Sequence, residues 1–268
     1  MRRFTPVLLS LCLVSSLAAT MVADGIKQPQ KKCPKKLADC PDDGCSTGRE
    51  IDGNLNRLKN ITDDNPEAQG EPEPHTLTWM KELGDPQHFE MGGSREELEQ
   101  LGEGKLIRVT ALLLTAKREG AESCNCQLDD AKVEDKDEGV NTDNHLVLVS
   151  RSTVQKFPLP DGANFTQWKN NLAKRERESV TMEFTPRVRL DHPNFTRAAV
   201  RPLILEARQL ALLVRVTGLL MFDSQHFKDP LVRVNNWEIH PILKLEFCPK
   251  GATCHADGDE GWESLDDQ

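Results

Sequence analysis

Beyond Lys105, the chain contains short segments in which apolar and polar residues alternate, the pattern of half-buried β-strands. In the first, Leu106–Thr115, Arg108 and Thr110 alternate with apolar residues. The other strands are expected near Cys124 and over His145–Val149, Ser179–Thr185, Leu210–Phe222 and Trp237–Phe247. Residues 165–178 are mostly charged and helix-compatible, so we expect a helix before the fourth strand.

About five strands in this order predict a mainly β fold. The expected architecture is a small closed or partly closed β-barrel, OB-like, with inserted helices. A β-sandwich with inserted helices is the alternative. The sequence Arg-Val-Thr-Ala-Leu-Leu at 108–113 returns as Arg-Val-Thr-Gly-Leu-Leu at 215–220, so these two strands would occupy comparable places in a barrel. Arg-Val-Thr is equally ordinary strand chemistry. Gly218 is expected to mark a bulge or bend.

Composition divides the chain into five parts. These are a signal peptide (1–19), a Cys-containing irregular lead segment (20–75), a short helical segment (76–102), the OB-like barrel domain (103–250) and an acidic tail (251–268). The lead segment is expected to hold one short helix near 54–59, and Pro202 predicts that a helix over 196–209 starts or kinks there. Six carboxylates and no basic residue in positions 257–268 predict a solvated tail.

The first residues are typical of a secretory signal peptide. Arg2 and Arg3 precede an apolar run, Val7–Leu17, that is too short to span a bilayer, and small residues follow it. We expect cleavage near Ala18 or Ala19, which leaves a mature chain without a transmembrane segment. The protein is therefore expected outside the cytoplasm, in the periplasm or secreted. An uncleaved membrane anchor is the alternative.

Charge and aromatic content argue against nucleic acid as a partner. The formal net charge is −9, and the chain has no Tyr, 9 Phe and 4 Trp. An acidic chain lacks a general field for phosphate backbones, and few aromatic side chains are present to stack on bases. Residues 169–215 are locally basic, with ten Lys and Arg side chains that include Arg197 and Arg201. We interpret them as offsetting the acidic loop expected at 129–143 and the acidic tail. An anion-binding face is the alternative.

Cysteine usage fits an oxidising compartment. Without Cys12 of the signal peptide, the disulfide candidates are Cys33, Cys40, Cys45, Cys124, Cys126, Cys248 and Cys254. Their number is odd, so at least one is free, paired between chains or cleaved away. The last two would close a small loop, and the first three would staple the lead segment. Neighbouring Cys124 and Cys126 should each reach a partner elsewhere.

The last expected strand, Trp237–Phe247, gives the best candidate site. Its odd positions are apolar and should face the core, so Glu238 and His240 project from the other face about 7 Å apart. A carboxylate and an imidazole at that spacing can bind a divalent metal or act as an acid/base pair. His145, Asp223 and His226 lie at the ends of other strands, where barrel loops converge.

These observations predict one polar cluster and leave its role open. The candidate metal ligands are His145, Asp223, His226, Glu238 and His240. The alternative is that these side chains only cap strands, set turns and bond the backbone. No phosphate-binding glycine loop, dinucleotide fingerprint or protease motif is present, so a divalent metal is the one cofactor with which the pattern is compatible.

Several of these segments resemble a family of uncharacterised secreted bacterial proteins. The most specific are His-Leu-Val-Leu at 145–148 and Trp-Glu-Ile-His-Pro at 237–241, and the resemblance covers roughly residues 40–248. It implies an exported OB-like module and implies that the five candidate ligands recur together. It implies no mechanism.

Three functions are compatible with the sequence. The first is an exported β-barrel module that binds an unknown ligand. The second is a metal-dependent hydrolase, with phosphoesters as one substrate class. The third is a structural envelope protein without a ligand. The oligomeric state is left open.

Overall fold

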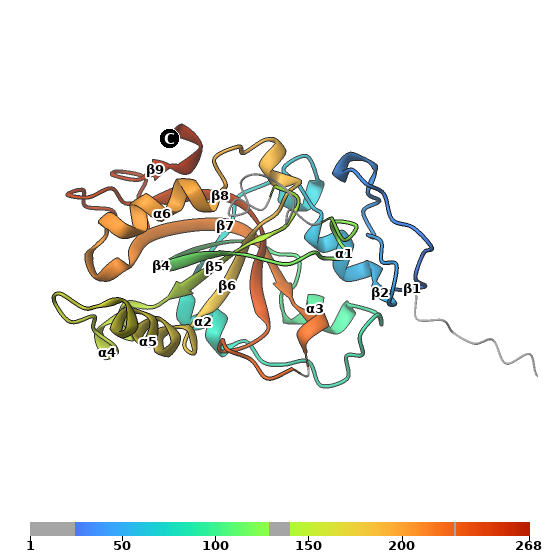
Figure 1. The fold of residues 1–268 in the computed structure, drawn as a ribbon, viewed down its shortest axis with the longest axis horizontal. Helices are drawn as coiled ribbons and strands as arrows, with labels where there is room; N and C mark the ends of the chain where they lie inside the picture. The colour runs from blue at the N-terminus through green and yellow to red at the C-terminus, as the bar shows by residue number, and fades with distance from the viewer. Residues whose placement is uncertain (1–24, 129–139, 228) are drawn as a thin grey trace, which may run out of the picture.

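The structure is a computed structural model that describes residues 25–128, 140–227 and 229–268. The expected signal peptide and most of the expected acidic loop lie outside these residues. A five-stranded mixed β-barrel forms the centre of the molecule (Figure 1). Its strands are β4 (Leu106–Arg118), β5 (Asn144–Val149), β6 (Val180–Phe184), β7 (Leu212–Phe222) and β8 (Trp237–Phe247).

The strands are joined in the order β4-β5-β6-β8-β7, and β7 pairs with β4 to close the barrel. All these pairs are antiparallel except β6 with β8, which is parallel. A small, mainly β, OB-like barrel is therefore confirmed. Short strands extend the structure: β3 (Glu73–Thr76) pairs with β4, β9 (Glu263–Ser264) pairs with β8, and β1 (Ile26–Lys27) pairs with β2 (Ile51–Asp52).

Alternation along the strands builds the core. The side chains of Val180, Met182 and Phe184 are fully buried on the inner face of β6, as their spacing predicts. Trp237 and Ile239 of β8 are buried in the same hydrophobic core. Burial of each such side chain stabilises the fold by roughly 1.5–3 kcal/mol.

The two Arg-Val-Thr segments lie side by side and form the closing seam of the barrel. Arg108 of β4 pairs with Thr217 of β7, and Thr110 pairs with Arg215. The register between β7 and β8 shifts on both sides of Gly218, which confirms the expected irregularity. A Cβ at Gly218 would lie 2.3 Å from the carbonyl oxygen of Pro241, so only glycine lets β8 approach this closely.

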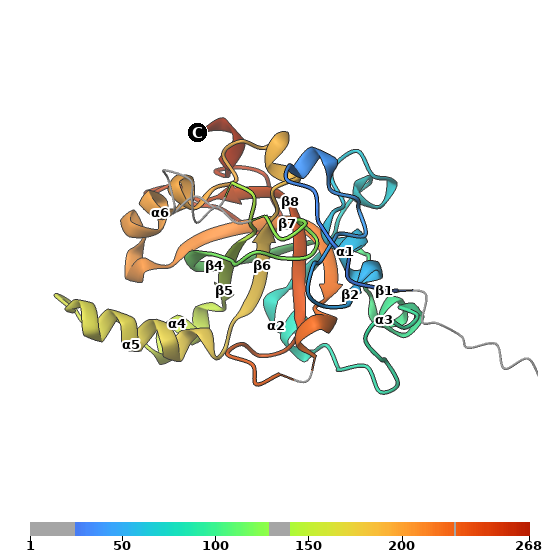
Figure 2. The ribbon, with the colours of Figure 1, turned by 45° about the vertical axis from the view of Figure 1, so that its right-hand side comes forward.

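Short helices surround the barrel. They are α1 (Gly53–Lys59), α2 (Leu77–Glu82), α3 (Glu96–Leu101), α4 (Arg151–Lys156), α5 (Phe165–Glu176) and α6 (Arg197–Glu206). The 3-10 helices are η1 (Leu37–Asp39), η2 (Pro66–Ala68), η3 (Val188–Leu190), η4 (Arg208–Leu210), η5 (Ser224–His226) and η6 (Leu265–Asp267). The helices α1 and α3 lie near one end of the barrel, and α4 and α5 project from the other (Figure 2).

Two local expectations are wrong. The chain around Cys124 is a turn and not a strand, because Cys126 and Gln127 have φ angles of 54° and 57°, outside the range of a strand. The expected start of a helix at Pro202 is also wrong, because α6 begins at Arg197 and Pro202 lies inside it. Its N-terminus is capped by Thr196, whose side chain accepts a hydrogen bond from the backbone N–H of Ala199.

Three disulfides are present: Cys33–Cys45, Cys40–Cys126 and Cys248–Cys254. The last closes the predicted small loop, and the second ties the lead segment to the turn after β4. Cys124 is a buried free thiol, so its expected disulfide is wrong. Disulfides at three sites indicate an oxidising compartment outside the cytoplasm. None of the helices in the described residues is long and apolar enough to cross a membrane.

The acidic tail is docked on the barrel through β9 and Leu265, while its six carboxylates are exposed to solvent, as the charge pattern predicts. Strand β9 pairs with β8, and Leu265 is fully buried. His192 contacts the carboxylates of Asp63 at 2.6 Å and Asp266 at 2.9 Å, which joins the tail to the lead segment. The hydrogen bond with Asp63 raises the pKa of His192 by more than burial lowers it. The hydrogen bond with Asp266 raises it further, to about 9. The tail therefore gains specific partners that its charge pattern does not reveal.

Candidate functional site

A polar cleft of about 250 Å³ lies on the outer face of β5, β6 and β8. Strand register places its floor. His145 of β5 pairs with Glu183 of β6, and Thr181 of β6 pairs with Glu238 of β8, so all four side chains share one face. The segment after β4 and the segment between β7 and β8 form the walls, and Lys59 of α1 also lines the cleft. In OB-folds, the face of the second and third strands and the two adjoining loops bind ligands.

The face opposite the core is buried here. Thr181 and Glu183 are 2% and 4% exposed, although they alternate with core residues. Glu238 and His240 are 1% and 0% exposed. The alternation predicted their common face, and the walls of the cleft remove that face from bulk water. Buried polar side chains need hydrogen-bond or charge partners, so their contacts decide what this site can do.

All five candidate ligands predicted from the sequence lie in or directly behind this cleft. His145 contacts Glu119 Oε1 through Nδ1 and Thr181 Oγ1 through Nε2, each at 2.7 Å. Both ring nitrogens therefore have protein partners, which fix His145 in the floor of the cleft. His145, Asp223, His226 and Glu238 line the cleft, whereas His240 lies behind it.

Asp223, His226 and Glu238 are joined through Arg233, which sequence reasoning missed. Arg233 donates hydrogen bonds to Asp223 Oδ2 at 2.8 Å and to Glu238 Oε1. Asp223 Oδ2 also contacts His226 Nδ1 at 2.7 Å, and this pairing raises the pKa of the half-exposed His226. Burial is the largest single effect on Glu238 and raises its pKa, but Arg233 and His240 together outweigh it and hold that pKa below its ordinary value. These carboxylates are ionised and compensated by protein groups.

A second group behind the cleft lacks such compensation. His240 Nδ1 lies 3.2 Å from Glu183 Oε2 and 3.6 Å from Glu238 Oε2, and its Nε2 lies 3.8 Å from Asp143 Oδ2. The nearest oxygens of Asp143 and Glu183 and both ring nitrogens of His240 are buried without a hydrogen-bond partner among the described residues. One donor atom from each of these three residues lies within 4.8 Å of the others, a spacing at which one metal ion fits.

Asp143 also belongs to an adjacent group with Glu122 and Cys124, whose donor atoms lie equally close together. Glu122 Oε2 contacts Lys59 Nζ at 2.8 Å and accepts a hydrogen bond from the Cys124 thiol at 3.2 Å. Burial disfavours the ammonium of Lys59, but Glu122 and then Glu183 outweigh it and raise the pKa of Lys59 well above its ordinary value. Lys59 therefore supplies a fixed positive charge to Glu122.

The carboxylates thus separate into two classes. Glu122 and Glu238 face Lys59 and Arg233, and their pKa values are lowered despite burial. Asp143 and Glu183 have no Lys or Arg in direct contact among the described residues. Burial and the neighbouring Glu238 raise the pKa of Glu183 well above its ordinary value, and burial and Glu122 raise that of Asp143. A cation beside these two groups would supply the missing charge.

Of this inner group, the sequence predicted His240 as a ligand and marked the segment 143–145 as a candidate. Asp143 precedes His145 in the pattern, but it was expected in an exposed loop and is fully buried. Successive side chains of a strand point to opposite faces, so Glu183 lies on the face of β6 away from Met182 and Phe184. The reasoning used for β8 would therefore have identified Glu183. Lys59 has no local signal, because it reaches the site from a helix in the lead segment.

No family model, no curated protein and no solved structure matches the chain. The resemblance to secreted bacterial proteins therefore stays a prediction.

Proposed function

We propose that this protein is an exported binding module whose ligand enters the cleft on β5, β6 and β8, next to a divalent metal bound by Asp143, Glu183 and His240. Export is supported by the three disulfides and the predicted signal peptide. The cleft position is supported by the general use of this face in OB-folds.

One observation carries the metal assignment: three buried residues present unpartnered donor atoms to one another. Leaving buried polar atoms unpaired costs about 1–3 kcal/mol each, so a bound group that satisfies them would stabilise the fold. Two carboxylate oxygens and one imidazole nitrogen are ligands suited to zinc or manganese, whereas calcium prefers oxygen ligands alone. Glu122 and Cys124 lie beside the site, where burial and Glu122 raise the pKa of the Cys124 thiol well above its ordinary value and keep it neutral.

The metal assignment is tested on the full chain after dialysis against a chelator. We expect one equivalent of zinc or manganese to rebind, measured by elemental mass spectrometry. A metal concentration about 100 times the dissociation constant should stabilise the fold by about 2.7 kcal/mol, seen as a rise in melting temperature. Glu183→Gln keeps the shape of the side chain and removes its charge, so it should weaken metal binding at least tenfold.

Glu176→Gln is the matched control, because Glu176 lines the same cleft but pairs with Lys117 and belongs to neither ligand group. This variant should bind metal like the unchanged protein. Equal loss of binding in the Glu176 and Glu183 variants would show a nonspecific effect of charge. No bound metal and no thermal stabilisation by zinc, manganese or calcium would rule out the site and favour a structural protein.

A second candidate function is metal-dependent hydrolysis, which the Asp223–His226 pair favours. Asp223 holds Nδ1 of His226, and the half-exposed imidazole leaves Nε2 facing away from this contact, as a general acid or base requires. Metal-loaded protein should then hydrolyse bis(p-nitrophenyl) phosphate. His226→Gln should lower kcat about 100-fold without changing the metal content. No turnover, or turnover unaffected by this substitution, would exclude this role of His226.

A further inference from the structure

A larger groove, of about 760 Å³, lies between α5 and α6 over the end of β4. Leu114 and Ala116 of β4 line it from below, Trp168 and Leu172 come from α5, and Ile204 comes from α6. Its volume is in the range of small-molecule sites, about 300–1,000 Å³. The groove shares only Lys117 with the lining of the polar cleft, so a ligand bound here would be independent of the function proposed there.

The groove exposes apolar surface that a folded protein normally covers. Phe165 is 73% exposed and Leu205 is 62% exposed, and both line it. The Phe165 ring stacks on Trp168 with 5.7 Å between centroids, which makes a continuous aromatic wall. Apolar patches of this kind mark binding sites.

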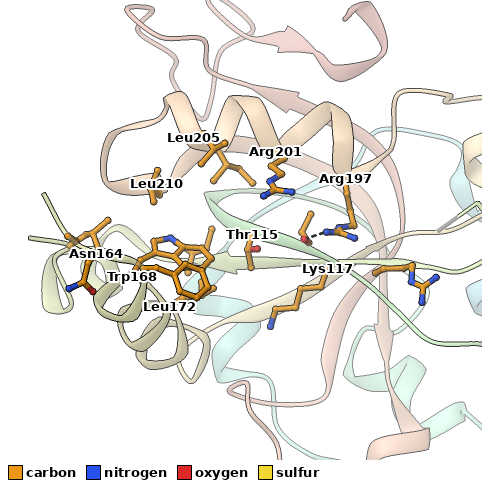
Figure 3. Close-up of a pocket in the computed structure, with 16 residues that line it drawn as sticks. Thr115, Lys117, Asn164, Trp168, Leu172, Arg197, Arg201, Leu205 and Leu210 are labelled. Carbon is orange, nitrogen blue, oxygen red and sulfur yellow. Dashed lines mark hydrogen bonds between the residues drawn. The ribbon is translucent and has the colours of Figure 1, made fainter. Parts of the chain in front are cut away.

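The two ends of the groove differ in character. Figure 3 shows Trp168, Leu172, Leu205 and Leu210 gathered toward one end, while Arg197 and Lys117 lie toward the other and Arg201 points between them. Among the described residues, the lining contains four cationic side chains, the fourth being that of Arg118, and no carboxylate. Because the chain as a whole has a net charge of −9, a groove with this lining is a local positive site that favours an anionic ligand.

Part of this positive charge has no ion-pair partner among the described residues. Lys117 pairs with Glu176 at 2.5 Å, whereas Arg201 makes no ion pair within the part of the chain that the structure describes. Nη1 of Arg118 is buried and has no hydrogen-bond partner in that same part. A guanidinium binds a carboxylate well because the two planar groups form paired hydrogen bonds.

We propose that this groove binds one long-chain carboxylate, with its head group beside Arg201 and Arg118 and its hydrocarbon chain along Trp168, Leu172 and Leu205. A single chain with one anionic end matches the separation of charge and apolar surface. The locally basic region at 169–215 is then an anion-binding face in part, which is the alternative that the sequence left open.

The test titrates the full chain with octanoate, decanoate and dodecanoate below their micellar concentrations, followed by calorimetry. Each added methylene should tighten binding about fourfold, from the free energy of burying one CH₂. Arg201→Gln should weaken dodecanoate binding about tenfold or more, because it removes a hydrogen bond to a charged group. Dodecanol should bind more weakly than dodecanoate, and dodecyltrimethylammonium weakest of all.

Arg208→Gln is the control, because Arg208 lies just beyond α6 and outside the groove but carries the same charge. It should leave dodecanoate binding unchanged. The proposal is overturned if both arginine variants lose affinity equally, or if the cationic and anionic amphiphiles bind alike. Attachment to phosphatidylglycerol vesicles without saturable binding of monomeric dodecanoate would also overturn it, because the occupant would then be a membrane surface.

Discussion

A buried ion pair between Arg95 and Glu103 clamps the segment around α3 to the end of β7. The guanidinium bonds both oxygens of Glu103 at 2.6 Å, the carbonyl oxygen of Phe222 at 2.9 Å and Ser224 Oγ at 3.0 Å. Glu103 Oε1 also accepts a hydrogen bond from the backbone N–H of Phe222 at 2.9 Å. The two charged residues are 7% and 5% exposed. The clamp therefore holds the chain on both sides of Asp223.

Replacing Glu103 by Gln removes the carboxylate that contacts the buried guanidinium most closely and leaves it Asp52, whose Oδ2 lies 3.8 Å from Nη1 of Arg95. Removing one partner of a buried pair destabilises by about 3–5 kcal/mol. For a chain of this size, each kcal/mol lowers the melting temperature by roughly 2–4 °C, so we expect a drop of roughly 6–20 °C. Urea unfolding followed by tryptophan fluorescence measures the change, since Trp237 is fully buried in the native fold.

The double variant Arg95→Met/Glu103→Met tests the cause of that loss. It removes both charges, so its destabilisation should be smaller than the sum of the single Met variants by at least about 1 kcal/mol. Glu178→Gln, in an exposed pair with Lys156, is the control and should cost less than about 1 kcal/mol. A loss below about 1 kcal/mol for Glu103→Gln, or strict additivity in the double variant, would show that the buried pair does not act as a clamp.

Three other predictions concern stability. Asp63 and Asp266 raise the pKa of His192 to about 9, so the protonated imidazole stabilises the fold. This stabilisation is complete below the ordinary pKa of 6.5 and is lost as the pH rises through 9. His192→Gln should therefore cost roughly 1–2 kcal/mol at about pH 6 and little at about pH 10 in urea titrations, and an equal loss at both would contradict this origin. Replacing Cys40 and Cys126 by Ala removes a disulfide between residues 86 positions apart and should lower the free energy of unfolding by about 4 kcal/mol, measured in guanidinium. This loss should exceed that from removing Cys248–Cys254, whose cysteines are 6 positions apart. Gly218→Ala places a Cβ against the Pro241 carbonyl and should destabilise by about 1–3 kcal/mol in thermal unfolding, and an unchanged melting temperature would contradict the close approach.

The sequence predicted much of the barrel because each strand carries its own pattern. Val180, Met182 and Phe184 repeat at period two and reach one core, and Glu238 and His240 face away from that core as expected. The turn near Cys124 was misjudged because Cys126, which lies in this turn, is bonded to Cys40, 86 residues away in the sequence. A local pattern carries no information on such a partner.

The candidate site likewise combines features that a local sequence pattern determined with features that depend on distant segments. Period two along a single strand determined that Glu238 and His240 share a face, and the spacing of Cys248 and Cys254 determined a small closed loop. Only the tertiary structure brings Asp143, Glu183 and Lys59 close to Glu238 and His240 and buries the polar face of the strands. The cause is that alternation fixes which way a side chain points from its own strand, whereas its neighbours and its distance from water depend on segments that fold against it from elsewhere in the chain.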